Sequence, residues 1–191
     1  MPTMRCFIAI DIDEDIRTAL GDLQQEIVAG ADIHKSDVKW VRPEAMHLTL
    51  KFLGDVRDRE VVNVCEVVKT VAARHKAFDL GVSEVGCFGG HSARVLWVGA
   101  GLDCPELLAL QQDVEDELAL GGWPKEARKF SGHLTLCRIR NAKAGVELAR
   151  VAEQYKDFDL GAMRCDSVCV YQSELRPEGP LYTCLGRYRL G

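Results

Sequence analysis

One tetrapeptide, His-Leu-Thr-Leu, occurs twice in this chain, at His47–Leu50 and again at His133–Leu136. Each copy lies in an apolar stretch that predicts a β-strand, in which successive side chains point to opposite faces. The His and the Thr of one copy therefore share a face, about 6 to 7 Å apart along the strand, while the leucines face a core. Two such strands facing each other would form a symmetric site with two imidazoles and two hydroxyls.

A second tetrapeptide, Phe-Asp-Leu-Gly, is also repeated, at Phe78–Gly81 and Phe158–Gly161. It follows a predicted helix in both halves, so the two repeats occur in the same relative order. This indicates a duplicated unit of strand, helix, strand, helix and strand. The prediction is an α+β fold that is bilobal and duplicated. In it, two antiparallel sheets related by a pseudo-twofold axis line a central cleft, with helices packed on the outer faces.

At 191 residues the chain has the length of a single two-lobed domain. We expect a first repeat over about 5–88, a second over about 94–170 and a C-terminal hairpin over about 171–190. Apolar alternation predicts strands over 5–12, 38–41, 46–53, 78–88, 94–98, 132–139 and 158–170. Helical periodicity predicts helices over 13–28, 57–74, 105–120 and 146–155.

The composition, with 47% hydrophobic and 28% charged residues, is that of a soluble globular protein. The apolar runs fall short of the roughly 20 residues that a membrane span needs, and the N-terminus lacks a secretory pattern. We therefore expect a cytoplasmic monomer without membrane partners. The eight cysteines are scattered and form no C-x-x-C pair, which predicts reduced, mostly buried thiols rather than disulfides or metal ligands.

The net charge of −5 argues against a protein that coats nucleic acid through a broad basic surface. Around the second His-Leu-Thr-Leu the balance is different. The window from Lys125 to Arg140 contains five basic residues and one acid, Glu126. This window is either a solvated basic turn or a local site for a small phosphate-bearing group.

Two imidazoles and two hydroxyls are suited to chemistry at phosphorus. An imidazole titrates near pH 6.5, so one His can accept a proton from water while the other donates one to a leaving oxygen. Thr49 and Thr135 can donate to phosphate oxygens, and an Arg adds a charge-assisted contact. Arg138 would point away from His133 on a regular strand, so this role requires a twist or bulge between them.

Other catalytic patterns are missing. Neither His-x-Thr strand contains an acid, and the chain has no H-x-x-x-H or H-E-x-x-H pattern, so a site without metal or other cofactor is preferred. Gly89-Gly90 lacks a phosphate-loop context and predicts a turn. No G-x-S-x-G nucleophile elbow is present. His34, His75 and His91 stand alone in loop, helix-end and turn contexts, and we expect structural roles for them.

With these residues in view, the chain resembles the two-histidine phosphoesterases, in particular the RNA 2′,3′-cyclic phosphodiesterases, also called 2′-5′ RNA ligases. The resemblance covers nearly the whole chain, through segments Arg5–Asp11, Trp40–Glu44, His47–Gly54, Arg94–Gly99, His133–Arg138 and Ser173–Gly179. It implies hydrolysis of a terminal 2′,3′-cyclic phosphate of RNA, or of a cyclic nucleotide, to a 2′-phosphomonoester without metal.

The resemblance also implies roles for individual residues. His47 would be the general acid that protonates the departing 3′ oxygen, and His133 the general base that activates water. Thr49, Thr135 and Arg138 would hold the phosphate. Phe52 is either a stacking platform for the terminal base or a core aromatic, because strand alternation places it on the side of Leu48 and Leu50.

Two alternatives remain open at this point. The first is a ligase that joins tRNA-half-like ends through a 2′-5′ linkage at the same site. The second is a module that binds nucleotides or RNA ends without turnover, for which two titrating groups would be unnecessary.

Overall fold

The computed structural model describes residues 2–177 and 179–191. In this part of the chain it contains nine strands: β1 (Thr3–Asp11), β2 (Val38–Trp40), β3 (His47–Arg57), β4 (Phe78–Phe88), β5 (Val95–Ala100), β6 (His133–Ile139), β7 (Asp159–Cys165), β8 (Ser167–Arg176) and β9 (Gly179–Arg189). Four α-helices connect them: α1 (Glu14–Gly30), α2 (Asp58–Ala72), α3 (Pro105–Leu120) and α4 (Ala142–Gln154). Two 3-10 turns, η1 (Lys35–Asp37) and η2 (Pro43–Ala45), flank β2.

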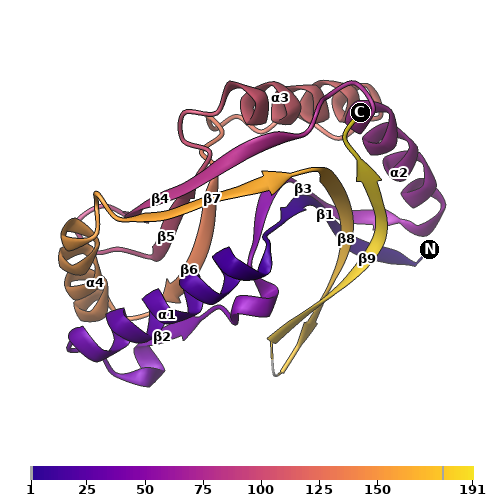
Figure 1. Cartoon of the computed structure of the whole chain (residues 1–191). Coiled ribbons are helices and arrows are strands. Elements are labelled where there is room, and N and C mark those ends of the chain that lie inside the picture. Colours follow the sequence, from indigo (N-terminus) through magenta and orange to yellow (C-terminus); the bar gives the residue numbers. More distant parts are fainter. Residues whose placement is uncertain (1, 178) are drawn as a thin grey trace.

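The strands form two antiparallel sheets, as the sequence predicts (Figure 1). The first sheet has the order β3-β1-β8-β9 and the second the order β2-β6-β5-β4-β7. Apart from β2, the two orders correspond strand for strand: β3 to β6, β1 to β5, β8 to β4 and β9 to β7. The strands that begin with His47 and His133 therefore occupy equivalent places in the two sheets.

Each sheet takes strands from both halves of the chain. β4, from the first half, pairs with β5 and β7 in the second sheet. β8 and β9 complete the first sheet by pairing with β1 and with each other. The two halves are thus interleaved, and the expected repeats over 5–88 and 94–170 describe a proposed duplication rather than a division between sheets.

Three differences from the predicted elements exceed two residues. The single strand expected over 158–170 is two strands, β7 in the second sheet and β8 in the first, separated by Asp166. β3 continues past Gly54, which takes a φ of +70° at an irregular register, and ends at Arg57. α4 begins at Ala142 instead of 146, because the Asn141 side chain caps the helix by accepting from the Lys143 amide at 2.8 Å.

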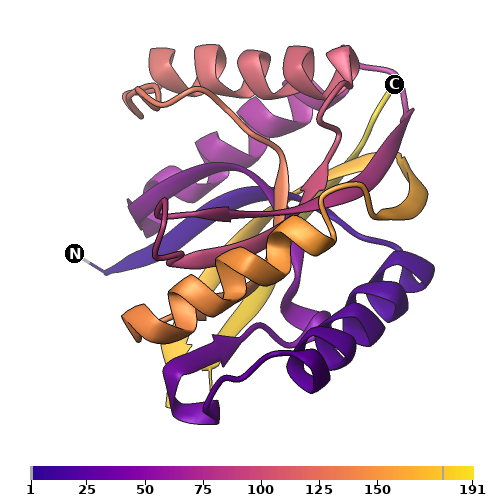
Figure 2. The same cartoon turned by 90° about the vertical axis from the view of Figure 1, so that its left-hand side faces the viewer.

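The helices cover the sheets in two pairs (Figures 1 and 2). α2 and α3 pack on each other and on strands of the first sheet, while α1 contacts β7 and α4 contacts β4, β5 and β6. One contiguous hydrophobic cluster runs through both sheets and all four helices. Among the described helices, none has the length and apolar character needed to cross a membrane.

Candidate active site

β3 and β6 share a backbone irregularity as well as a tetrapeptide. In β3, Thr49 pairs with Ala9 and Lys51 with Ile8, so Leu50 is an additional residue that forms a β-bulge. In β6, Thr135 pairs with Trp97 and Cys137 with Leu96, so Leu136 bulges in the same way. Both strands then follow one burial pattern, in which the first and third residues are half-buried, the second, fourth and fifth are buried, and the sixth is exposed.

The bulges reverse the expected alternation beyond the fourth residue. Phe52 is therefore 71% exposed, whereas Lys51 is 5% exposed. The alternative of a core aromatic at Phe52 is wrong, because the extra residue at Leu50 turns its ring to the other face. Arg138 holds the equivalent position in β6, and the bulge supplies the irregularity that its predicted phosphate-binding role requires.

Both motif imidazoles are held by the same backbone contact. The Nδ1–H of His47 donates to the carbonyl of Ala45 at 3.0 Å, and the Nδ1–H of His133 donates to the carbonyl of Ser131 at 2.7 Å. A carbonyl oxygen can only accept, so the contact places a proton on Nδ1 of each ring. Nε2 is therefore the nitrogen of each imidazole that is available for acid/base chemistry.

His47 lies among aromatic side chains of the first sheet. Its ring stacks on Phe7, with ring centroids 4.6 Å apart and planes 27° apart, and Tyr182 approaches it edge-on at 5.1 Å. The exposed Phe52 ring lies 6.0 Å from Phe7. Burial lowers the pKa of His47 below its usual 6.5, an effect opposed by the hydrogen bond to Ala45 and by the negative charge of Asp11.

Asp11 is paired with His47 across β1 and β3 and anchors a polar network. Its carboxylate accepts a hydrogen bond from the Tyr171 hydroxyl at 2.7 Å and forms an ion pair with Arg187. The Cys169 thiol also points to this carboxylate, with 3.7 Å between Sγ and Oδ2. This network fixes a negative charge beside His47 and holds β1, β8 and β9 together.

His133 has a different neighbourhood. Phe88 meets its ring edge-on at 5.0 Å, and Trp97 lies 6.3 Å away. Trp97 lies flat over Gly86, where an added Cβ would be 2.3 Å from the indole. Across the strand pair, the residue opposite His133 is Gly99, in the place that Asp11 holds in the first sheet. A Cβ at Gly99 would lie 2.7 Å from the Ser83 carbonyl oxygen, so packing excludes a carboxylate there.

The two sheets meet near these strands. β3 and β6 are in contact with each other, although they belong to different sheets. Burial raises the pKa of the Tyr182 hydroxyl, which lies on β9. The positive charge of Arg138, on β6, lowers this pKa by a smaller amount. Tyr182 also touches His47, so it lies near both Arg138 and His47.

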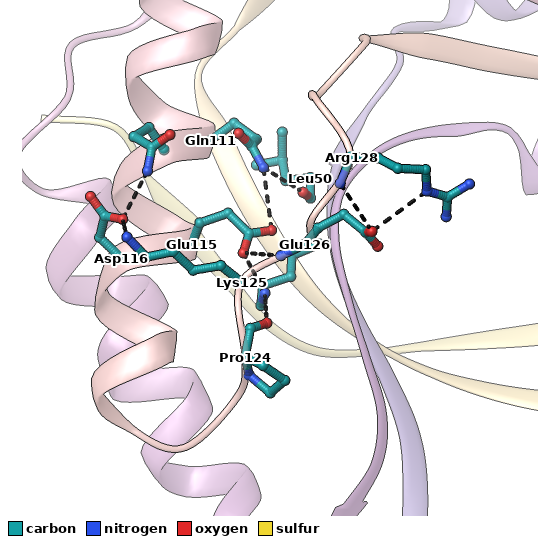
Figure 3. A network of polar contacts seen from close by, with 10 residues as sticks. Leu50, Gln111, Glu115, Asp116, Pro124, Lys125, Glu126 and Arg128 are labelled. Carbon is teal, nitrogen blue, oxygen red and sulfur yellow. Dashed lines mark hydrogen bonds and ion pairs between the residues drawn. The ribbon is translucent and has the colours of Figure 1, made fainter.

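The bulge in β3 also turns Lys51 into the interior, where it anchors the loop that leads to β6. Figure 3 shows the contacts of Gln111 and Glu115 in this network. Lys51 Nζ donates to Glu115 Oε2 at 2.5 Å and to the carbonyl of Pro124 at 2.8 Å. The same Glu115 oxygen accepts the Glu126 amide at 3.1 Å. Gln111 joins the Leu50 carbonyl to Glu115, with both distances 3.4 Å. The ion pair thus connects the His47 strand to the loop that precedes His133.

The basic window is divided by the fold. Lys125 pairs with Asp116 and Arg128 with Glu126, both on the exposed loop before β6. Arg138 lies on β6 itself, on the same face as His133 and Thr135. Of the basic residues in this window, Arg138 is therefore the one that the bulge aligns with the motif.

The remaining candidates take structural positions. His75 Nε2 contacts Asp113 at 2.8 Å, His34 caps η1, and His91 lies exposed in a turn. All eight cysteines are unpaired, and five of them are buried. Across residues 2–177 and 179–191, no group of three or more His, Cys, Asp or Glu side chains could hold a metal ion. An open hollow of about 600 Å³ beside β4 and β7 contains none of the predicted site residues.

With this geometry in place, comparison with known proteins is informative. A family model described as LigT like Phosphoesterase matches residues 10–97 and 103–182. The chain belongs to the LigT-like phosphoesterases. An RNA 2′,3′-cyclic phosphodiesterase of Methanothermobacter thermautotrophicus is 32% identical over 189 residues, which cover 98% of this chain and 99% of that protein. A second, from Archaeoglobus fulgidus, is 32% identical over 94% of this chain and 96% of its own length.

Solved LigT structures have the same fold. Escherichia coli LigT in complex with 3′-AMP superposes with a TM-score of 0.79 and 23% identity, over 99% of both chains. A Thermus thermophilus protein superposes with a TM-score of 0.80 and 24% identity, over 98% of both. At these identities the likeness shows the fold, and the family assignment depends on the sequence matches.

Sequence reasoning did not identify several residues around the LigT-like motifs. Around His47 these are Asp11, Phe7, Tyr171 and Tyr182, and around His133 they are Phe88 and Trp97. The available signal was the resemblance of the segments Arg5–Asp11 and Arg94–Gly99, which contain Phe7, Asp11 and Trp97 but had no role assigned to these residues. The aromatic neighbours are distant in the sequence and come together through strand pairing.

Proposed function

We propose that this protein hydrolyses a terminal 2′,3′-cyclic phosphate on RNA, or on a cyclic nucleotide, to a 2′-phosphomonoester, using two imidazoles and no metal. The observation that carries the proposal is the shared geometry of the two motif histidines. Each donates Nδ1–H to the carbonyl two residues earlier and keeps Nε2 available, with a threonine hydroxyl on the same face. Membership of the RNA 2′,3′-cyclic phosphodiesterase family supports the substrate class.

In the proposed reaction, His133 Nε2 removes a proton from a water molecule, whose oxygen attacks the phosphorus. The bond between phosphorus and the 3′ oxygen breaks, and His47 Nε2–H delivers a proton to that oxygen. The products are a 3′ hydroxyl and a phosphate on the 2′ oxygen. The two imidazoles have then exchanged protonation states, and proton exchange with solvent restores them.

The phosphate contacts follow from the shared face of the strands. The hydroxyls of Thr49 and Thr135 donate to non-bridging oxygens, and the Arg138 guanidinium adds a charged contact that strengthens as negative charge accumulates in the transition state. The exposed Phe52 ring provides a stacking platform for the terminal base, which suits a substrate of any base. The complex of Escherichia coli LigT with 3′-AMP supports a nucleotide at such a site.

The assignment of acid and base involves the pKa of His47. Because burial lowers the pKa of His47, the free protein holds this ring largely neutral at pH 7. A bound phosphate anion favours the charged imidazolium, so the substrate itself helps His47 to become protonated. We therefore keep His47 as the acid, with its proton taken up as the phosphate binds.

A product assay tests the proposal. Purified protein is incubated with a short RNA that ends in a 2′,3′-cyclic phosphate, in excess chelator, and the product is identified by chromatography and mass spectrometry. We expect a 2′-phosphomonoester and a bell-shaped dependence of kcat/KM on pH. Unchanged RNA, or turnover that appears only after a divalent metal is added, would contradict the proposal.

The same assay distinguishes the alternatives. Adding an RNA with a free 5′ hydroxyl would give a 2′-5′ linked product if the protein acts as a ligase. A module that only captures RNA ends would bind the cyclic phosphate and leave it intact.

A further inference from the structure

Of the aromatic side chains that the structure describes next to His47, Tyr182 is the one that carries a hydroxyl. Its ring is edge-on to His47 at 5.1 Å and edge-on to Phe7, also at 5.1 Å. It is half-buried on β9, opposite Ser173 of β8. The packing on two rings restrains the phenol ring beside the imidazole.

The Tyr182 hydroxyl has no hydrogen-bond partner within residues 2–177 and 179–191. Other tyrosines of the chain differ in this respect. The Tyr171 hydroxyl donates to Asp11 at 2.7 Å, and the Tyr155 hydroxyl donates to Glu26 at 2.9 Å. Among the described residues, Trp97 Nε1 is the one buried side-chain polar atom without a partner, so the Tyr182 hydroxyl is open to solvent. It is therefore available to a ligand that binds beside His47.

The charges around Tyr182 determine what it can do. Burial raises the pKa of Tyr182, and the nearby Arg138 charge lowers it by less, so the phenol stays protonated at neutral pH. A protonated phenol donates a hydrogen bond and does not act as a base. Its position next to a guanidinium and an imidazole suits an anionic acceptor such as a phosphate oxygen.

The second sheet has no equivalent of this residue. β9 pairs with β8 along its whole length, from Ser167 to Arg176. β7, which holds the corresponding place in the second sheet, pairs with β4 only from Phe78 to Ser83. Phe88 therefore lies beyond the end of β7, whereas His133 is in register with Asp159 of β7 through Gly99 and Ser83. Among the described residues, the aromatic neighbours of His133 are Phe88 and Trp97, neither of which has a hydroxyl. Tyr182 therefore adds a hydroxyl on the His47 side of the site, next to the histidine assigned as the acid.

We propose that Tyr182 is a further catalytic residue, whose hydroxyl donates a hydrogen bond to one non-bridging oxygen of the phosphate that lies between His47 and Arg138. This inference rests on the proposed function. It makes the two non-bridging oxygens unequal, because only one of them faces β9.

The test compares Tyr182→Phe with Tyr188→Phe. Both substitutions remove one hydroxyl from β9 and keep the ring, and Tyr188 packs against the hydrophobic core. For hydrolysis of a 2′,3′-cyclic nucleotide, Tyr182→Phe should lower kcat/KM by about 10- to 100-fold, the effect of losing a hydrogen bond to a charged group. Tyr188→Phe should stay within about two-fold of the unmodified protein. The melting temperature of each variant checks that it is folded.

A phosphorothioate substrate separates direct contact from a structural role. Sulfur at one non-bridging position accepts hydrogen bonds poorly, so the two diastereomers should react at different rates, and Tyr182→Phe should reduce that difference. A rate for Tyr182→Phe within two-fold of normal overturns the inference. A lower rate with an unchanged diastereomer ratio also overturns it, because the hydroxyl would then act on the fold and not on the phosphate.

Binding of inorganic phosphate keeps this inference separate from the proposed function. If the unmodified protein leaves the cyclic substrate intact, the proposed function fails. The contact is still supported if the protein binds phosphate and Tyr182→Phe binds it at least five-fold more weakly. Equal phosphate binding by both proteins, in the absence of turnover, overturns the contact as well.

Discussion

The strands that carry His47 and His133 have the same tetrapeptide, the same bulge and the same Nδ1 contact, yet the two imidazoles have different surroundings. His47 is enclosed by Phe7 and Tyr182 and lies opposite a carboxylate. His133 meets Phe88 and Trp97 and lies opposite Gly99, where packing leaves no room for a side chain. Two strands with similar backbones thus place their imidazoles in different environments.

The difference teaches how a duplicated motif can serve two roles. A general acid must start the reaction protonated and a general base must start it neutral. Two imidazoles in identical surroundings would have no preference for either role. Here desolvation lowers the pKa of His47, and the charge of Asp11 partly opposes that effect. The repeated motif supplies the positions of the two rings. The side chains around them, with Asp11 and Phe7 of β1 and Tyr182 of β9 beside His47, supply the difference.

The strongest test of the comparison removes each imidazole in turn. We expect His47→Ala and His133→Ala each to lower kcat by about 10²- to 10⁴-fold, because either loss removes one half of the proton transfer. Steady-state kinetics on a 2′,3′-cyclic nucleotide measure this, with His91→Ala as a matched control in an exposed turn. A near-normal rate for either motif variant, with folding intact, would contradict the two-imidazole mechanism.

The residue after the bulge offers the next test. Lys51→Met leaves the buried Glu115 carboxylate without its cation, and we expect a loss of about 3–5 kcal/mol in the free energy of unfolding. At the equivalent buried position in β6, Cys137→Ala removes a single sulfur atom and should cost on the order of 1 kcal/mol. Urea denaturation measures both. Similar losses for the two variants would mean that the Lys51 ion pair does not anchor the loop.

The exposed sixth residues, Arg138 and Phe52, should separate phosphate from base recognition. Arg138→Ala should weaken hydrolysis of every cyclic substrate by about 10- to 150-fold, because a charged hydrogen bond is lost. Phe52→Ala should weaken it by about 5- to 150-fold for nucleotides, the range for one stacked base, and leave binding of inorganic phosphate unchanged. Titration with phosphate and with a cyclic nucleotide checks both. Weaker phosphate binding in Phe52→Ala would contradict the division of roles.

The smallest expected effect is a shift in pH dependence. Asp11 raises the pKa of His47, so Asp11→Asn should lower that pKa further below 6.5. If His47 is the acid, the alkaline limb of the kcat/KM profile moves to lower pH, since activity requires the protonated ring. If His47 is the base, the acidic limb moves to lower pH instead. A profile with both limbs in place would show that Asp11 has no influence on a catalytic imidazole.

Much of the fold could be predicted because local patterns are strong. The helix over 105–120 and the strand over 78–88 have the predicted bounds, since their periodicity and the turn residues that flank them mark them clearly. The two-strand split at Asp166 was missed, because an apolar run does not show at which residue the chain changes sheets. Sheet membership depends on contacts between distant strands.

The bulges show how far alternation alone can be used. A regular β6 would have directed Arg138 toward the core, where an unpaired charge is unfavourable, and this conflict was the signal for an irregular strand. β3 gave no such conflict, since a regular strand would have buried Phe52 and exposed Lys51. If the irregularity inferred for the His133 strand had also been assigned to the His47 strand, Phe52 would have been predicted to be exposed.

The two motif strands, the pairing of His with Thr on one face and the family could be read from the sequence, because alternation and repeated segments are local properties of the chain. Which strands share a sheet, the burial of Lys51, and the positions of Asp11 and Tyr182 beside His47 and of Gly99 opposite His133 were visible only in the folded chain. Those outcomes depend on strand register and on packing between residues far apart in the chain, which local patterns do not specify.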